Sequence, residues 1–199
     1  MDSSIATGIN ESGTVVGISF QFQNSANQQG FTWTASTGMQ PIPGSLSALS
    51  VNSGQVAGMD TGNHAAIFSN GQTEDLGTLG ATSVSTSVNS AGRAVGLSGT
   101  HAFFFDGTIR DLGLRNNWTS ASAAGINDAG LVVGNGLSPG NVSHSFTWSS
   151  AIGLNDVNTL IPANSGWTII SVFGINARGQ ICGLGQNNGA LHAVLLNPN

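Results

Sequence analysis

The chain contains no lysine and no tyrosine, one cysteine and five prolines in 199 residues, and charged residues make up 7% of it. Its four cations are all arginines, set against nine acids for a formal net charge of −5. A nucleic acid or an anionic membrane surface needs clustered cations to bind, so we expect neither as a partner. The single Cys182 excludes an internal disulfide framework.

Long apolar runs are also missing, and none reaches the ~20 residues with which a helix crosses a bilayer. We therefore expect no membrane insertion. The first residues show no charged segment followed by an apolar one, so we expect no signal peptide in this chain. The 29 glycines follow no three-residue period, which excludes a collagen-like chain and assigns them to turns and bulges.

What the chain has instead is an internal repeat, which decides the fold class before any single residue does. Three short motifs follow one another in a fixed order. The first motif reads GINESGTVVG at 8–17, SVNSGQVAG at 50–58, SVNSAGRAVG at 87–96, GINDAGLVVG at 125–134 and GINARGQICG at 174–183. The second reads QGFTW at 29–33, HAAIF at 64–68, HAFFF at 101–105, HSFTW at 144–148 and HAVLL at 192–196. The third reads GMQPI at 38–42, EDLG at 74–77, RDLG at 110–113 and NDVN at 155–158, and has no fifth copy.

Each copy divides into four short β-type runs. An Asn-x-x-Gly turn joins the first run to a Val-rich second run, which suits a type I turn closed by a left-handed glycine. In the second copy this turn, Asn52-Ser53-Gly54, is one residue shorter, so its geometry must differ. Aromatic residues two apart in the third run share one face of the sheet. The glycines expected in the left-handed region are Gly13, Gly92, Gly130 and Gly179.

Five units of four strands predict an all-β domain, a small five-bladed β-propeller whose blades bury their aromatic residues against one another. A linear solenoid would need polar end caps, which both terminal units lack. The last unit stops after its third run. A glycine closes every second run, and we expect this run to lie nearest the central channel, where backbones converge. The approximate units are 3–46, 47–81, 82–116, 117–163 and 164–199, in one domain over 1–199.

The ordered motifs resemble the HAF repeat family, a group of bacterial repeat proteins classed as extracellular. The segment 165–198, with SGWTIISVFGINARGQICGLG and LHAVLLNP, is similar to the closing repeat of such proteins. The resemblance implies a secreted, extracellular repeat protein and carries no chemistry to any residue. Gly30 stands where the family has its His.

All four histidines occupy one position of the repeat, which allows two interpretations. A ring of imidazoles is a candidate metal site, because neutral His binds divalent transition metals. Alternatively each His begins a core-facing strand and bonds to a neighbouring blade, and the shared face with the aromatic residues favours this structural role. The histidines are His64, His101, His144 and His192.

No residue pattern predicts catalysis. The recurring Asp75, Asp111 and Asp156 are expected at strand ends, and their spacing places no carboxylate pair across a cleft. Neither Glu11 nor Glu74 is a convincing general acid. The chain has no nucleophile elbow, and Cys182 lies in a Val-rich run as a packed thiol. We expect no cofactor.

Loop length locates a binding surface. The links between runs two and three, and between units, vary in length and emerge on the same rim of the blades, where loops on a rigid scaffold commonly bind ligands. Tryptophan faces bordered by amides and an Arg suit a glycan, although the tryptophans could equally fill gaps between blades. The residues placed on this rim are Phe20, Phe22, Gln28, Asp60, Arg115, Asn117, Trp118, Asn141, Asn164 and Trp167.

The sequence therefore predicts a non-enzymatic extracellular binding module that recognises a glycan or a cell-surface protein. One alternative is a small polysaccharide-active hydrolase or lyase that uses Asp60 or the histidines, with or without a divalent metal. Another is a structural component of a surface layer or filament. Fold alone does not decide among these functions.

Overall fold

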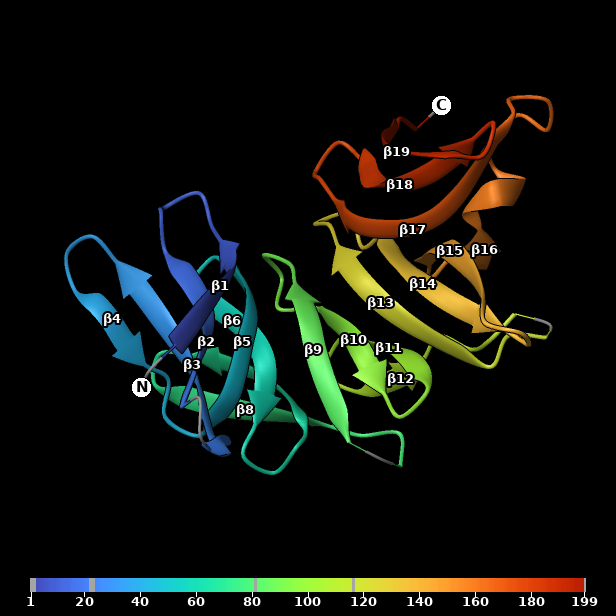
Figure 1. Ribbon diagram of the computed structural model, residues 1–199. Coiled ribbons are helices and arrows are strands. Elements are labelled where there is room, and N and C mark those ends of the chain that lie inside the picture. Colours follow the sequence, from blue (N-terminus) through green and yellow to red (C-terminus); the bar gives the residue numbers. More distant parts are fainter. Residues whose placement is uncertain (1–2, 22–23, 81, 116, 199) are drawn as a thin grey trace.

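The computed structural model describes residues 3–21, 24–80, 82–115 and 117–198. They form five antiparallel sheets, one for each repeat, set side by side in an open arc (Figure 1). We call these sheets blades 1 to 5. Their strands are β1 (Ser3–Ile9), β2 (Val15–Gln21), β3 (Asn24–Thr34) and β4 (Gly38–Pro41); β5 (Ser45–Asn52), β6 (Gln55–Asp60), β7 (Ala65–Ser69) and β8 (Gln72–Gly77); β9 (Ser83–Val88), β10 (Ala94–Ser98), β11 (His101–Phe105) and β12 (Ile109–Asp111); β13 (Ser120–Ile126), β14 (Val132–Ser138), β15 (Val142–Ser149) and β16 (Gly153–Asp156); and β17 (Trp167–Ile175), β18 (Ile181–Asn187) and β19 (Ala190–Leu196). A short 3₁₀ helix, η1 (Val157–Thr159), follows β16.

The predicted turns are confirmed. The four glycines of the Asn-x-x-Gly turns have φ between 75° and 81°. In the shortened copy, Ser53 and Gly54 both have positive φ, 47° and 80°, which is the backbone of a two-residue I′ hairpin. The motif Asn holds its turn from inside: the side-chain oxygen of Asn89 accepts hydrogen bonds from the backbone N–H groups of Ala91 and Arg93.

The first strand of each blade, and not the second, lies at the axis of the arc. A central cavity of about 270 Å³ is lined only by first-strand residues, which contradicts the expectation from the recurrent glycines. All five glycines instead lie against a carbonyl oxygen of the first strand, and Gly17, Gly96 and Gly134 also face the aromatic residue of the third strand. A Cβ on Gly134 would lie 2.5 Å from Cζ of Phe146 and 2.3 Å from the carbonyl oxygen of Ser122, so only glycine fits. The cavity is lined by residues 7–9, 49–51, 86–87, 124–126 and 173–175.

Consecutive blades are held together by apolar side chains from their facing surfaces. We call the surface that points to the preceding blade the front face, and the surface that points to the following blade the back face. Between blades 3 and 4, Phe104 and Leu112 of a back face pack with Ile126 and Phe146 of a front face. Equivalent clusters join blades 1 and 2, blades 2 and 3, and blades 4 and 5. The blades therefore bury their aromatic ladders by wedging against one another, as predicted.

One cross-strand row recurs on every front face, and we call it the front row. In blades 2 to 4 its members are mostly buried, because the preceding blade covers them. The front rows, in strand order, are Ile9, Val15, Trp33 and Met39; Val51, Val56, Phe68 and Thr73; Val88, Ala94, Phe105 and Ile109; Ile126, Val132, Trp148 and Leu154; and Ile175, Ile181 and Leu196.

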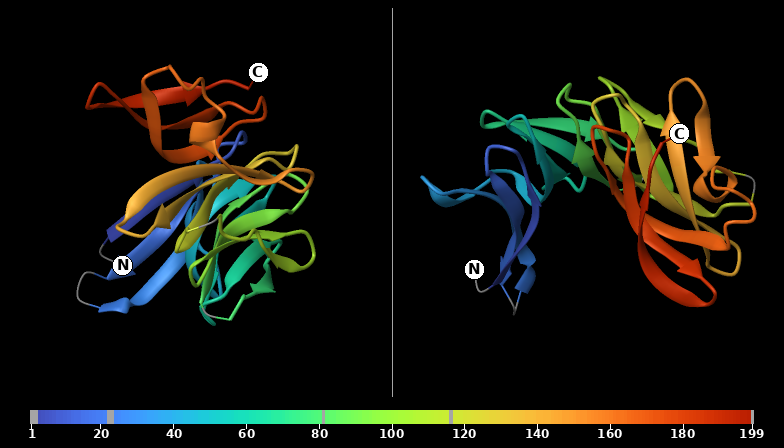
Figure 2. Two further views of the ribbon diagram at one scale, coloured as in Figure 1. Left: turned by 90° about the vertical axis from the view of Figure 1, so that its right-hand side faces the viewer. Right: turned by 90° about the horizontal axis from the view of Figure 1, so that it is seen from above.

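A five-bladed propeller is expected to close into a ring, but over the part of the chain that the structure describes the ring is open. Blades 1 and 5 do not form the packed contact that joins consecutive blades (Figure 2). On the front face of blade 1, Ile9, Trp33 and Met39 are 69%, 40% and 48% exposed. On the back face of blade 5, Phe173 is 63% exposed. Cys182 is exposed on that face too, rather than packed, because no further blade covers it.

Blade 5 has three strands where the others have four, in line with its missing third motif. Pairing of β3 with β2 also corrects the alignment of the first unit. Gly30 pairs with Ile18 in the way that Ala102, the residue after His101, pairs with Leu97 in blade 3. The His position of blade 1 is therefore occupied by Gln29 and not by Gly30. Among the described residues, no helix has the length and apolar character needed to span a membrane.

Candidate functional site

The repeated His and the repeated Asp meet within each blade. His64 Nδ1 lies 2.9 Å from Asp75 Oδ2, and His144 Nδ1 lies 3.2 Å from Asp156 Oδ2. In blade 3, the His101 Nδ1 and Asp111 Oδ2 atoms are 2.8 Å apart, without the alignment of a hydrogen bond. For these three histidines the expected hydrogen bond to a neighbouring blade is wrong, because the fourth strand of the same blade brings an acid to the His instead.

The His–Asp contact changes the acidity of both groups in blade 2. The hydrogen bond that His64 donates to Asp75, followed by the negative charge of Asp75, raises the pKa of His64 above 6.5. The same hydrogen bond lowers the pKa of Asp75 below 3.8. Both side chains are solvent-exposed, so the pair contributes little to stability.

Blade 2 adds a third group, which the other His–Asp pairs lack among the residues that the structure describes. Asp60, the last residue of β6, lies with His64 and Asp75 so that their ligand atoms are all within 4.8 Å of one another. One oxygen of Asp60 accepts hydrogen bonds from the backbone N–H groups of Gly62 and His64, which fixes its position. The four predicted histidines do not form a single ring, because each lies in its own blade beside its own acid or aromatic partner.

Trp118 is a wedge between blades 3 and 4. Its side chain is 8% exposed and packs in the apolar cluster that joins these blades. The indole stacks on the imidazole of His144 at a centroid distance of 5.0 Å, and it covers Gly136, where a Cβ would meet the ring at 2.3 Å. The gap-filling alternative therefore describes Trp118, and its indole has little surface left for a ligand.

Trp167 occupies the equivalent place in blade 5 but remains partly open. It contacts His192 edge to face at 5.4 Å and is 37% exposed. A groove of about 390 Å³ beside it runs along β19 and is lined mainly by apolar side chains, among them Ile161 and Pro162. The repeat predicted that the two tryptophans are equivalent, but it could not show that only one is covered.

Of the remaining rim residues, Arg115, Asn117, Asn141 and Asn164 lie on links as predicted, whereas Phe20 and Gln28 lie within β2 and β3. Phe20, Gln28 and Arg115 are half-buried, while Asn117, Asn141 and Asn164 are exposed. Asn117 and Asn141 have φ of 70° and 60°, so they serve their turns as well as the surface. Phe22 lies outside the described residues.

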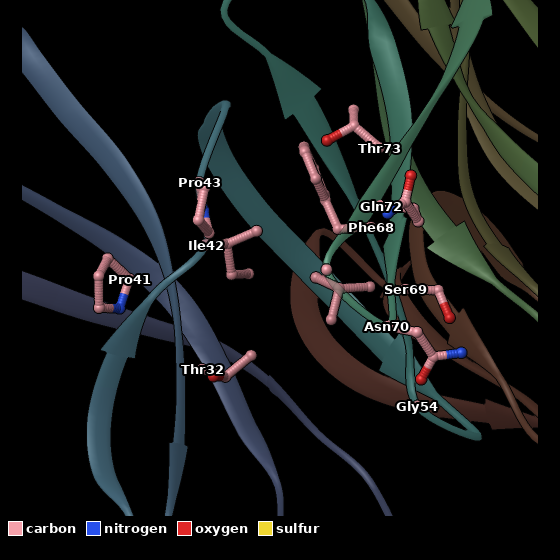
Figure 3. A pocket seen from close by; sticks show the side chains of 12 residues that line it. Thr32, Pro41, Ile42, Pro43, Gly54, Phe68, Ser69, Asn70, Gln72 and Thr73 are labelled. Atoms are coloured by element: carbon pink, nitrogen blue, oxygen red, sulfur yellow. The ribbon is translucent and has the colours of Figure 1, made fainter.

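A second cavity, of about 250 Å³, was not anticipated from the sequence. It lies between blades 1 and 2 on the side of the short links, where Ile42 and Pro43 face Phe68 and the turn at Asn70 (Figure 3). Its lining contains no ionisable side chain, and the same holds for the central cavity and for the groove along β19. General acid–base chemistry has no donor in these three places.

Comparison with known proteins bears on the fold. No family model matches the chain, and no match was found among curated proteins. The beta-propeller domain of the Trilobed protease from Pyrococcus furiosus, described as having an open velcro topology, superposes on 98% of this chain with a TM-score of 0.61. The fold is a β-propeller. Sequence identity is 8%, and the chain spans 67% of that propeller chain, so the likeness concerns architecture alone.

Proposed function

We propose that the protein is a non-enzymatic interaction module that binds through the blade faces at the ends of its arc. The observation that carries the proposal is the front row of blade 1, whose Ile9, Trp33 and Met39 are exposed while the same row is largely covered in blades 2 to 4. Burying one such side chain stabilises an assembly by about 1.5–3 kcal/mol. Exposed apolar patches of this kind mark interaction sites in soluble proteins.

A second copy of the chain is the partner that fits this face best. Each chain carries both halves of the blade-on-blade interface, a front face on blade 1 and a back face with Phe173 and Leu195 on blade 5. The four internal interfaces show that such faces pack together. Head-to-tail contacts of this type produce a closed ring if the rotation between copies closes, and an open polymer if it does not.

Analytical ultracentrifugation over a concentration series tests the proposal. The wild-type chain should associate, whereas Trp33→Glu and Phe173→Glu should each remain monomeric when alone. Mixed in equal amounts, the two variants should form a dimer and nothing larger, because each retains one intact face. Ile152→Glu is the matched control, since Ile152 is exposed in the turn between β15 and β16, away from both end faces. A wild-type chain that stays monomeric up to millimolar concentration contradicts the proposal.

We propose an extracellular location for this module, supported by the resemblance of its motifs to HAF repeats. Carbohydrate binding is a second candidate function, favoured by the partly exposed Trp167 face near the exposed amide of Asn164. A glycan array probed with wild type and Trp167→Ala tests it. Signal that survives the substitution, or no signal from folded wild type, removes this candidate.

The metal-dependent hydrolase or lyase is supported only by the Asp60, His64 and Asp75 cluster. Titration with Zn²⁺, followed by calorimetry, should show one site in wild type and none in Asp60→Ala if the cluster binds metal. The His101–Asp111 pair, which has no third acid beside it among the described residues, is an internal reference. Equal Zn²⁺ binding by both proteins would exclude a role for Asp60.

A further inference from the structure

Blade 5 ends in a strand with no outer neighbour among the described residues. In the other four blades the third strand pairs with a fourth: β3 with β4, β7 with β8, β11 with β12 and β15 with β16. In blade 5 the order is β17-β18-β19 and stops there. The outer edge of β19 thus presents backbone donors and acceptors that can pair with an added strand.

The internal blades show what a fourth strand supplies. In blade 3, Ile109 packs on the front face, Asp111 lies beside the imidazole of His101, and Leu112 is buried on the back face. Blade 4 repeats the arrangement, with Leu154 on the front face, Asp156 beside His144 and Val157 buried on the back face. The pattern is aliphatic-x-Asp-aliphatic, read from the fourth strand into the residue that follows it.

Blade 5 contains the third-strand residues of each contact, but among the described residues it has no fourth strand to meet them. His192 occupies the His position, and its contact among the described residues is with the Trp167 ring and not with an acid. In blades 3 and 4 the residue after the fourth strand, Leu112 or Val157, is buried on the back face. Blade 5 has no such residue among those described, and the back-face side chain of Leu195 is 59% exposed. The groove along β19 is lined by four consecutive residues of the strand, 193–196, and on its other side by Ile161, Pro162 and Ile169.

We propose that this edge is a binding site for an extended segment of the class aliphatic-x-Asp-aliphatic, added antiparallel to β19 as the fourth strand of blade 5. None of the fourth strands that the structure describes is free to be the donor, because β4, β8, β12 and β16 are already paired within their own blades. For this chain in solution, the donor is therefore a partner polypeptide. Main-chain hydrogen bonds to β19 provide affinity, and the side-chain contacts provide selectivity.

Each side chain of the segment has a defined place. The first aliphatic residue enters the groove beside Leu196, as Ile109 lies beside Phe105 in blade 3. The Asp faces His192, and the second aliphatic residue covers the back face next to Leu195. The site shares Leu195 with the back face of blade 5 but does not involve the front face of blade 1, so a chain that cannot associate head to tail through Trp33 still carries it.

The test uses a peptide with the sequence of residues 107–115, Gly-Thr-Ile-Arg-Asp-Leu-Gly-Leu-Arg, acetylated and amidated at its ends. Titration into the full chain should show saturable one-to-one binding. Hydrogen exchange should slow in residues 190–196 and leave β12 unchanged. Replacing the peptide Asp by Asn should weaken binding about two- to fivefold, as expected for an exposed ion pair. A peptide of the same composition in scrambled order should not bind.

Variants of the chain separate the contacts. His192→Ala should weaken binding and abolish the difference between the Asp and Asn peptides. His101→Ala is the matched control, because its blade already holds a fourth strand, and it should bind the peptide like wild type. Trp33→Glu should also bind like wild type, which distinguishes failure of this site from failure of the self-association. No saturable binding at millimolar peptide, or exchange protection away from β19, overturns the proposal.

Discussion

The side-chain amide of Asn89 donates a hydrogen bond to the backbone carbonyl of Asn127, 3.1 Å away in the next blade. Asn127 in turn donates to the carbonyl of Asn176 in blade 5. Each of these asparagines also accepts hydrogen bonds from its own turn. One residue type at one motif position therefore shapes a hairpin, and in blades 3 and 4 it also links its blade to the next.

Asn127→Ala should destabilise the protein by about 2–4 kcal/mol, because it removes a buried interblade hydrogen bond and leaves turn donors unpaired. Urea denaturation measures the loss. Asn10→Ala is the matched control, since Asn10 makes the same turn contacts and no interblade bond is found for it among the described residues. Its loss should be smaller by about 1 kcal/mol or more. Equal losses would show that the interblade bond adds nothing.

Gly134→Ala should cost about 1–3 kcal/mol or more, because the added methyl group would overlap the Phe146 ring and the Ser122 carbonyl. Gly174→Ala, also in a strand, is the control. Its Cβ would meet only the Cys182 sulfur at 3.8 Å, so we expect almost no change in the urea midpoint. A neutral Gly134→Ala would contradict the close packing described here.

Trp118→Ala should destabilise the protein by about 3–5 kcal/mol, because it opens a cavity between blades 3 and 4. Trp167→Ala removes a partly exposed side chain and should cost less than about 2 kcal/mol. Thermal unfolding of the two variants compares them directly. A larger loss for Trp167 would reverse the assignment of Trp118 as the wedge.

The His64–Asp75 pair predicts a defined pH dependence. The raised pKa of His64 gives stability that is complete below pH 6.5 and is lost as the pH rises through the raised value. The lowered pKa of Asp75 gives stability that is present above pH 3.8 and is lost as the pH falls through the lowered value. Both contributions coexist between these two ordinary values.

An NMR titration of the His64 ring checks this dependence. Its midpoint should lie above 6.5 in wild type and return toward 6.5 in Asp75→Asn. If the midpoint is the same in both proteins, the carboxylate does not act on the imidazole in solution.

The repeat pattern was sufficient to predict five antiparallel sheets, the left-handed turn glycines and the shared face of residues such as Phe103 and Phe105. It could not show which strand lies at the axis, because side-chain alternation defines the two faces of a sheet but not its radial direction. A recurrent glycine such as Gly134 looks the same in the sequence whether the group packed against it is the backbone of another strand or an aromatic side chain. For the same reason, the structural role of Trp118 became visible only when His144 and Gly136 were placed beneath it.

The partners of the histidines were missed although both motifs had been identified. His101 and Asp111 are ten positions apart, and only the register of β11 against β12 brings them together. The exposed state of Cys182 was also hidden from the sequence. A Val-rich run predicts a buried residue only if another blade covers it.

The difference between the front and back faces gives the arc a direction, because every blade contacts its neighbours head to tail. A unit inserted between any two neighbours would pack its front face on the back face of the preceding blade and its back face on the front face of the following blade. Gain or loss of whole units would therefore alter the length of the arc and the width of its opening, while both terminal surfaces kept the same chemistry. The length of such a protein can change without the invention of a new interface.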